Sequence, residues 1–382
     1  MLSLGSFVAL GLPDGMLGTA WPSMRVSFGA PVGGLGLILL IATAGSVTVT
    51  AFAGALIQRL GVPAVLSVAG AAAAAGYAGF ALAPGLWLVL GVAVLAGAAA
   101  GMMDAGLNTA VALTGRPRLL NLLHGAYGVG TAIGPLVVTA AILTGSWRPA
   151  YLALCSLDLI MAGLWLGHRR RGGAANPVQQ AETDRPQPAA VWSRRRYQAV
   201  VAAGLGVFFL YAGLEVGAGQ WEASFCRGQL NLTAGATGLA AFGYWGSLTA
   251  VRIGLGLLPR PSAPRAVVRC GAALAVAAAA VIWWRPGPVV TVTAFAVLGG
   301  ALAGIFPALI ALTPARLGAR HARHVISWQV GAAAAGGACI SAAIGLLIGA
   351  TSLAVLGPSV TVLAVGVAAA ELVLTGLVPA AP

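Results

Sequence analysis

Twelve apolar stretches of about twenty residues, separated by short segments containing Arg, Pro and Gly, dominate this 382-residue chain. A helix of that length crosses the hydrocarbon core of a bilayer. Such a helix also pairs its own backbone groups, which lipid cannot do. Composition agrees, because 59% of the residues are hydrophobic and 8% are charged, against about a quarter charged in soluble domains. We predict an all-α integral membrane protein, with transmembrane helices at 2–24, 32–57, 62–83, 86–113, 119–144, 149–167, 197–222, 233–258, 264–284, 288–314, 324–349 and 353–377.

One long polar stretch divides the apolar runs six and six. Residues 168–196 contain Arg clusters and several Pro, a composition typical of linkers. We therefore expect an N-terminal six-helix bundle at 1–167, a cytoplasmic linker at 168–196 and a C-terminal six-helix bundle at 197–382.

The basic residues, all of them Arg, predict the orientation. Sixteen of the 21 fall in loops on the side of the N-terminus and four on the opposite side. Cytoplasmic loops accumulate Arg and Lys, so we expect both termini in the cytoplasm and the chain in the inner (cytoplasmic) membrane. Because these Arg residues are scattered between apolar runs, no nucleic-acid partner is expected.

The two halves repeat each other at an offset near 200 residues. The segment 11–21 resembles 212–221, which pairs Asp14 with Glu215, and 104–113 resembles 303–312. Repeats of this kind place a binding site between two related bundles. We predict two pseudo-symmetric bundles around a central cavity.

Acids inside the apolar runs are the first functional candidates. Asp14, Asp104 and Glu215 lie well within predicted helices, where a carboxylate costs at least about 2.5 kcal/mol. Asn108 follows Asp104 by one helical turn and shares its face. We expect Asp104, Asp14 and Glu215 to couple transport to protons, with Asp14 and Asn108 also contacting substrate.

The remaining titratable residues leave alternatives open. His124, on the next helix after Asp104, either relays a proton or is structural. Asp158, Glu222 and Glu371 are expected to be hydrogen-bonded in the interior or to snorkel toward the interface.

Aromatic and amide side chains recur together in the predicted helices. Aromatic faces and amides together hold small polar ligands, whereas Trp residues can also belong to the interfacial belt. The substrate-binding candidates are Trp21, Trp221, Trp245, Trp328, Gln220 and Gln329. Arg59 and Arg252 are gating candidates, and Arg252, inside a predicted helix, is expected to pair with an acid or line the cavity.

Several motifs resemble the major facilitator superfamily, and more specifically its fucose permease and sodium-dependent glucose transporter branch. The segment 54–61 looks like the family's signature loop, although Gln58 stands where an acid is usual. The other motifs are the Asp104 and Asn108 pair, 120–136, 211–221 and 244–252. The resemblance implies roles in substrate binding and proton coupling for acids at Asp14 and Asp104.

These features predict a secondary active transporter, not an enzyme. We expect proton-coupled symport of a sugar or similar small polar solute by alternating access, in a monomer surrounded by lipid. The alternatives are a proton-driven drug or metabolite exporter, which residues 130–135 partly resemble, sodium-coupled sugar uptake, and a non-transporting receptor. Four widely spaced Cys indicate neither a disulfide framework nor a metal site, and no cofactor is expected.

Overall fold

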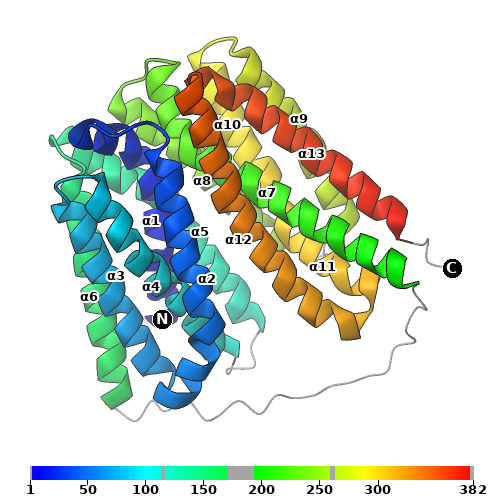
Figure 1. The fold of residues 1–382 in the computed structure, drawn as a ribbon, viewed down its shortest axis with the longest axis horizontal. Coiled ribbons are helices and arrows are strands. Elements are labelled where there is room, and N and C mark those ends of the chain that lie inside the picture. Colours follow the sequence, from blue (N-terminus) through cyan, green and yellow to red (C-terminus); the bar gives the residue numbers. More distant parts are fainter. Residues whose placement is uncertain (1, 113–116, 171–192, 259–262, 379–382) are drawn as a thin grey trace.

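The computed structural model describes residues 2–112, 117–170, 193–258 and 263–378, and these residues are helical throughout apart from short connections (Figure 1). Since α10 and α11 form one interrupted span, the helices of the described residues make twelve spans, which confirms the predicted fold class. Within these ranges, ten spans are long and apolar enough to cross a membrane. The helices are α1 (Leu2–Phe28), α2 (Gly34–Leu60), α3 (Val62–Leu82), α4 (Leu86–Ala112), α5 (Pro117–Leu143), α6 (Arg148–Arg170), α7 (Arg194–Gly228), α8 (Ala234–Leu257), α9 (Pro264–Trp284), α10 (Pro288–Leu302), α11 (Ile305–Leu317), α12 (Ala319–Ala350) and α13 (Leu356–Leu377), with a 3₁₀ turn at Leu353–Val355.

Several helices are longer than the apolar runs that predicted them. Helix α7 begins at Arg194 and ends at Gly228, whereas its apolar run covers 197–222. Hydropathy marks the part of a helix that lies in hydrocarbon, but the backbone hydrogen bonds continue into the polar region. Most of the segment 168–196, which the sequence predicts as a linker, lies outside the described residues.

The helices pair in the same way in both halves of the chain. Helix α1 packs on α5, α2 on α4 and α3 on α6; correspondingly, α7 packs on α12, α8 on α10 and α9 on α13. The two groups, α1–α6 and α7–α13, meet where α2 contacts α12, α5 contacts α8 and α1 contacts α7. This arrangement is the one that a repeated six-helix unit produces.

Glycines allow the backbones of α1 and α5 to approach closely. A Cβ atom on Gly15 would lie 1.9 Å from the carbonyl oxygen of Thr131, and one on Gly11 would lie 2.1 Å from that of Tyr127. Small residues at helix contacts are a common source of packing energy in membranes. This contact places Asp14 of α1 beside Tyr127 of α5.

The tenth span is broken between α10 and α11, at Ala303 and Gly304. Two side chains from other helices bind carbonyls at the break. The Tyr211 hydroxyl donates to the Leu302 oxygen at 3.0 Å, and Arg252 Nε donates to the Ala303 oxygen at 3.1 Å. Irregular backbone inside a membrane protein needs such partners.

The two ends of the molecule differ. We call the end at which α2 and α6 finish and α7 and α9 begin the Arg-rich end, because Arg59, Arg169, Arg170, Arg194, Arg195, Arg196, Arg265 and Arg269 lie there. The opposite end, where α1 finishes and α2 begins, is the far end.

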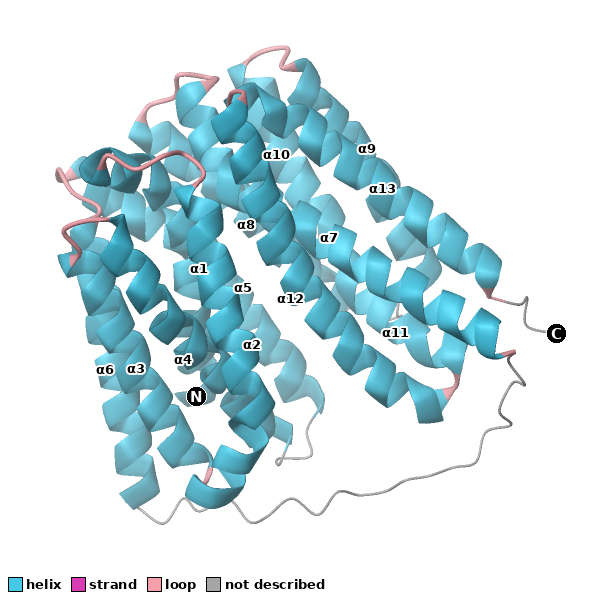
Figure 2. Ribbon diagram, in the orientation of Figure 1, coloured by secondary structure: helices cyan, strands magenta, loops and turns pink. Residues whose placement is uncertain are grey.

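Helices α2 and α12 touch near the far end and diverge toward the Arg-rich end (Figure 2). Gly36 lies against Ala342 so closely that a Cβ atom there would be 2.5 Å from the Ala342 Cα. Toward the Arg-rich end, Val47 of α2 and Trp328 of α12 are 52% and 56% exposed. The far end is therefore the closed end in this conformation.

We predict that replacing Gly97 with Ala destabilises the protein, because its Cβ would lie 1.9 Å from the Ala42 carbonyl oxygen, where α4 crosses α2. The free energy of unfolding should fall by about 1–3 kcal/mol, the usual cost of overpacking. Gly91→Ala on the same helix is the control, since its Cβ would meet nothing within 4 Å. Thermal unfolding in detergent, followed by Trp fluorescence, measures both; equal effects of the two changes would contradict the packing described.

Candidate functional site

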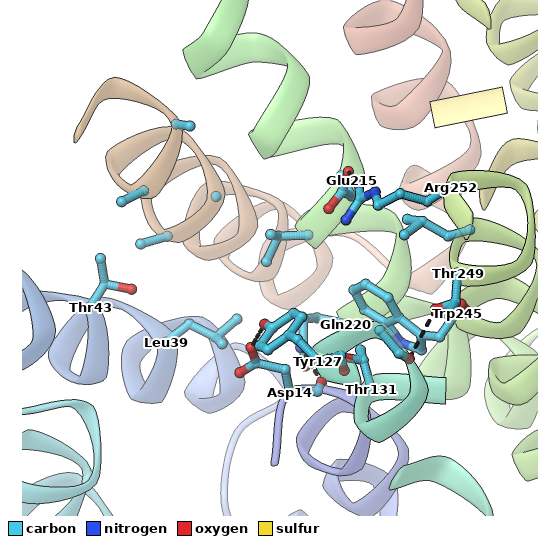
Figure 3. A pocket seen from close by; sticks show the side chains of 17 residues that line it. Asp14, Leu39, Thr43, Tyr127, Thr131, Glu215, Gln220, Trp245, Thr249 and Arg252 are labelled. Atoms are coloured by element: carbon cyan, nitrogen blue, oxygen red, sulfur yellow. Dashed lines mark hydrogen bonds and ion pairs between the residues drawn. The ribbon is translucent and has the colours of Figure 1, made fainter. Parts of the chain in front are cut away.

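A cavity of about 360 Å³ lies between the two groups of helices (Figure 3). Its volume is at the small end of the range for ligand pockets. Helices α1, α2, α5, α7, α8 and α12 all contribute to its wall. The lining residues are Asp14, Leu39, Thr43, Tyr127, Gly128, Thr131, Glu215, Val216, Gln220, Trp245, Leu248, Thr249, Arg252, Ala333, Ala334, Gly337 and Ala338.

Asp14 supplies a carboxyl group to the side of the cavity formed by the N-terminal half. The hydroxyl of Tyr127 donates a hydrogen bond to this carboxyl group. Across the contact between the halves, Gln220 Nε2 donates to the backbone oxygen of Asp14 at 2.7 Å. The amide of Gln220 therefore ties α7 to α1 beside the carboxyl.

Glu215 and Arg252 form an ion pair on the opposite wall, with Arg252 Nη2 3.5 Å from Glu215 Oε2. The side chains are 18% and 29% exposed, so they reach the cavity while most of their surface is buried. The Tyr211 hydroxyl shares its one proton between the Leu302 oxygen and the Glu215 carboxylate, and Tyr244 donates to the Glu215 backbone oxygen at 2.7 Å. The pair is thus fixed to the break between α10 and α11 through Arg252 and Tyr211.

Trp245 and Thr249 complete the wall on α8. Trp245 is almost fully buried, with one side on the cavity. The Thr249 hydroxyl donates to the Gly128 carbonyl oxygen of α5 at 2.9 Å. This hydrogen bond joins the two halves directly beside the Trp245 indole.

Five of the residues selected from the sequence therefore line one cavity: Asp14, Glu215, Gln220, Trp245 and Arg252. Asp14 and Glu215, which the internal repeat pairs, lie on its two sides. Arg252 both pairs with an acid and lines the cavity, as expected.

Asp104 and Asn108 do not line this cavity. They lie on α4, where Asn108 Nδ2 donates to Asp104 Oδ1 at 3.0 Å, one turn away. Asp104 and His124 are both exposed, and His124 interacts electrostatically with Asp104 and with Arg252.

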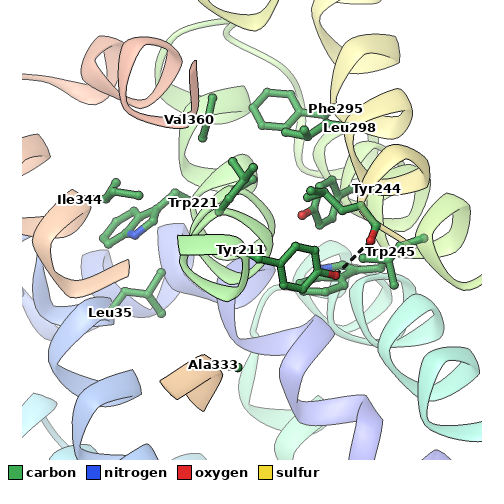
Figure 4. Close-up of a cluster of buried hydrophobic side chains, with 14 of the residues drawn as sticks. Leu35, Tyr211, Trp221, Tyr244, Trp245, Phe295, Leu298, Ala333, Ile344 and Val360 are labelled. Carbon is green, nitrogen blue, oxygen red and sulfur yellow. Dashed lines mark hydrogen bonds between the residues drawn. The ribbon is translucent and has the colours of Figure 1, made fainter. Parts of the chain in front are cut away.

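Two of the tryptophans predicted to bind substrate lie away from the cavity in this conformation. Trp21 and Trp221 are fully buried. Their indole N–H groups donate at 2.9 Å to the backbone oxygens of Val32 and Ser341. Figure 4 shows Trp221 beside Ile344 of α12, on the side of α7 away from Tyr244.

The structure places three further candidates away from the cavity. Gln329 is buried and accepts a hydrogen bond from Thr313 at 3.0 Å, so its amide oxygen is already used. Trp328 is largely exposed and does not line the cavity. Arg59, expected at a gate, is exposed at the end of α2 and makes no hydrogen bond or ion pair with the described residues.

Sequence reasoning did not select the tyrosines. Tyr127 and Tyr211 bind the two cavity acids, and Tyr244 binds the backbone of α7. A Tyr in the middle of an apolar run needs a partner for its hydroxyl, and this signal could have found all three.

The other acids of the predicted helices, Asp158, Glu222 and Glu371, are buried. Glu371 has the partners that a structural role requires. Glu371 of α13 forms an ion pair with Arg316 of α11 and accepts a hydrogen bond from Thr375 at 3.1 Å. Both carboxyl oxygens of Glu222 lack a hydrogen-bond partner among the described residues.

The family follows from a comparison with known families. A family model described as Major Facilitator Superfamily matches residues 3–342. The chain belongs to the major facilitator superfamily. Membership places it among secondary transporters rather than enzymes. No match was found among curated protein sequences.

Solved structures with this fold include several members with different solutes. A D-xylose-proton symporter has 14% sequence identity and a TM-score of 0.79, covering 99% of this chain and 97% of that chain. A mutant of the nucleoside transporter NupG has 14% identity and a TM-score of 0.77, covering 98% of each chain. A mutant of the peptide transporter POT, in complex with sulfate, has 15% identity and a TM-score of 0.69, covering 99% of this chain and 95% of that chain. At these identities the likeness establishes the fold.

We predict that Glu215 and Arg252 stabilise the protein as a coupled pair. Glu215→Gln and Arg252→Met should each lower the free energy of unfolding, because each leaves the partner's charge uncompensated. The double variant should lose less than the sum of the single losses, with a coupling energy of about 1–3 kcal/mol.

The control is the exposed contact in which Arg285 Nη1 donates to Gln229 Oε1 at 2.8 Å. Its double-mutant cycle should give a coupling of at most about 0.5 kcal/mol. Thermal unfolding in detergent measures both cycles, and strict additivity at Glu215 and Arg252 would contradict their pairing.

Proposed function

We propose that this protein is a proton-coupled symporter that imports a sugar or a similar small polar solute by alternating access. We place it in the fucose permease and sodium-dependent glucose transporter branch, as a monomer in the inner membrane with both termini and the Arg-rich end in the cytoplasm. The supporting observation is the composition of the cavity: two acids, one Arg, an amide and an indole around a volume of about 360 Å³.

The small volume and the polar groups favour a small polar solute over a large apolar drug. Asp14 and Gln220 can bind hydroxyl groups of a solute, and the Trp245 indole can stack on its CH surface. The D-xylose and nucleoside substrates named for two structures of this fold are of a size that suits this cavity. The exporter remains the alternative, distinguished by the direction of proton movement.

We assign coupling chiefly to Asp104 and solute contact chiefly to Asp14. A coupling carboxyl must exchange protons with water on one side of the membrane at a time. Asp104 is exposed in this conformation, in which the Arg-rich end is open, and it attracts a positive charge on His124, which Arg252 repels. Proton binding at Glu215 would remove its attraction to Arg252, so this acid is the second coupling candidate.

The register of α2 against α12 supports a rocking motion. Gly33 faces Gly345 and Gly36 faces Ala342. The two helices are therefore antiparallel here, and three residues forward along α2 correspond to three residues backward along α12. Continued toward the Arg-rich end, this register brings Val47 opposite Gly331. Both are exposed here, and a Cβ on Gly331 would meet nothing within 4 Å.

We predict that cysteine pairs at the two ends cross-link in different conformations. In a background without the four native cysteines, Gly33→Cys with Gly345→Cys should form a disulfide in the conformation described. Val47→Cys with Gly331→Cys should form one only after the Arg-rich end closes. Disulfides require Cα atoms about 4.4–6.8 Å apart.

Mass spectrometry of linked peptides measures the two reactions, and Val47→Cys alone is the control. Linking one pair first should suppress the other at least about tenfold, a difference of about 1.4 kcal/mol. Simultaneous formation of both disulfides in one molecule would refute the rocking motion.

We predict that Asp104→Asn abolishes uphill uptake driven by a pH gradient and leaves solute counterflow within about twofold, because Asn keeps the shape of a protonated Asp but releases no proton. Asp14→Asn should impair both. D-xylose, D-glucose, L-fucose, uridine and a dipeptide form the solute panel, selected by thermal shift and then tested in proteoliposomes.

Asp158→Asn is the control, because Asp158 is a buried acid of α6 outside the cavity. It should leave coupling intact. If Asp104→Asn still concentrates solute on a proton gradient, coupling lies elsewhere, with Glu215 tested next. If neither Asp104→Asn nor Asp14→Asn changes transport, the proposed symport fails.

A further inference from the structure

Five buried neutral side chains near the far end each have a polar atom without a hydrogen-bond partner among the described residues. All five are more than nine-tenths buried. The atoms are Thr139 Oγ1, Gln220 Oε1, Ser224 Oγ, Thr237 Oγ1 and Ser341 Oγ. The other described residues with such atoms are the acids Glu222 and Glu371.

Two of the five lie on the contact between the halves. Thr139 of α5 lies against Gly238 of α8, where a Cβ on the glycine would be 1.9 Å from the Thr139 hydroxyl oxygen. Gln220 of α7 lies against Gly18 of α1, where a Cβ would be 2.5 Å from the Gln220 backbone oxygen. Ser224 follows Gln220 by one turn and therefore shares its face of α7.

The other two adjoin residues of the same contact. Thr237 precedes Gly238, and Ser341 precedes Ala342, which faces Gly36 of α2. Thr139, Gln220 and Ser224 thus flank the closed far end, and Thr237 and Ser341 directly precede residues that do. We call these five residues, which carry hydroxyl or amide groups, the seal group.

Burial in the closed far end is energetically unfavourable for polar atoms without hydrogen-bond partners. A buried donor or acceptor without a partner loses the hydrogen bonds that it makes with water, and native structures contain few of them. Opening the far end would let water or a solute bind the same atoms. The seal group therefore disfavours the closed conformation and favours the open one.

We propose that the seal group is a second solute-binding site, which forms when the far end opens and which takes an uncharged solute rich in hydroxyl groups. Hydroxyl and amide groups both donate and accept hydrogen bonds but carry no charge, which suits hydroxylated solutes better than ions. The inference rests on the proposed transport function, and it adds a site through which solute passes before it reaches Asp14.

The test compares triple variants in a background with Ala342→Cys and without the native cysteines. Thr139→Val, Thr237→Val and Ser224→Ala together remove three unpartnered hydroxyls at nearly constant volume. A membrane-impermeant maleimide should label the thiol introduced by Ala342→Cys only when the far end opens. Labelling of the triple variant should be at least about tenfold slower, and its thermal stability should be higher.

The matched control is Thr48→Val, Thr293→Val and Ser156→Ala. These three hydroxyls are exposed and donate to carbonyls of their own helices, so labelling should stay at the parental rate. Equal labelling of the two triple variants, or a lower stability of the seal variant, would overturn the proposal. This part needs no solute and is therefore independent of the proposed function.

The second part tests the solute class. D-xylose and uridine should protect the introduced thiol from labelling, and choline and L-lactate should not. Protection should persist with Asp14→Asn, which disables the central cavity, because the seal group lies largely outside it. Loss of protection with Asp14→Asn would assign binding to the central cavity alone. Absence of protection by both hydroxylated probes, or protection by an ion, would overturn the proposed class.

Discussion

The ion pair between Glu215 and Arg252 connects the main features of this structure. Charges inside a membrane protein persist only with partners. Arg252 has two, the Glu215 carboxylate and the Ala303 carbonyl at the helix break. Because Pro307, four residues later, has no N–H to donate to this carbonyl, the Arg252 side chain can bind it and so joins the cavity wall to the interrupted span.

The wall of the cavity formed by the N-terminal half depends on helix packing instead of an ion pair. There the close packing of α1 on α5, permitted by Gly11 and Gly15, brings Tyr127 to the Asp14 carboxyl. The cavity thus presents one acid held by a hydroxyl and another held by a cation. A solute or a proton that changes either acid acts on a contact between helices, which is how a small ligand can shift a two-state equilibrium.

Much of the fold could be predicted because long apolar segments must satisfy their own backbone hydrogen bonds in lipid, and few structures other than transmembrane helices do so. The internal repeat likewise predicted Asp14 and Glu215 as paired residues of two related bundles, and the structure places both on one cavity. Periodicity could not decide which face of a helix meets the cavity. Trp221 and Gln220 are neighbours in sequence, yet one packs against α12 and the other contacts α1. The break at Ala303 does have a sequence signal, because Pro307, four residues later, has no N–H to donate to the Ala303 carbonyl.

The central claim is that movement of solute through this cavity is coupled to the movement of protons in the same direction. The most direct test adds a solute from the panel to proteoliposomes in weakly buffered medium and records the external pH. The account predicts that the medium becomes more alkaline as solute enters, and that Asp104→Asn abolishes this change while solute still exchanges. Acidification of the medium on solute addition would indicate proton exchange in the opposite direction, and uptake with no pH change would contradict proton coupling.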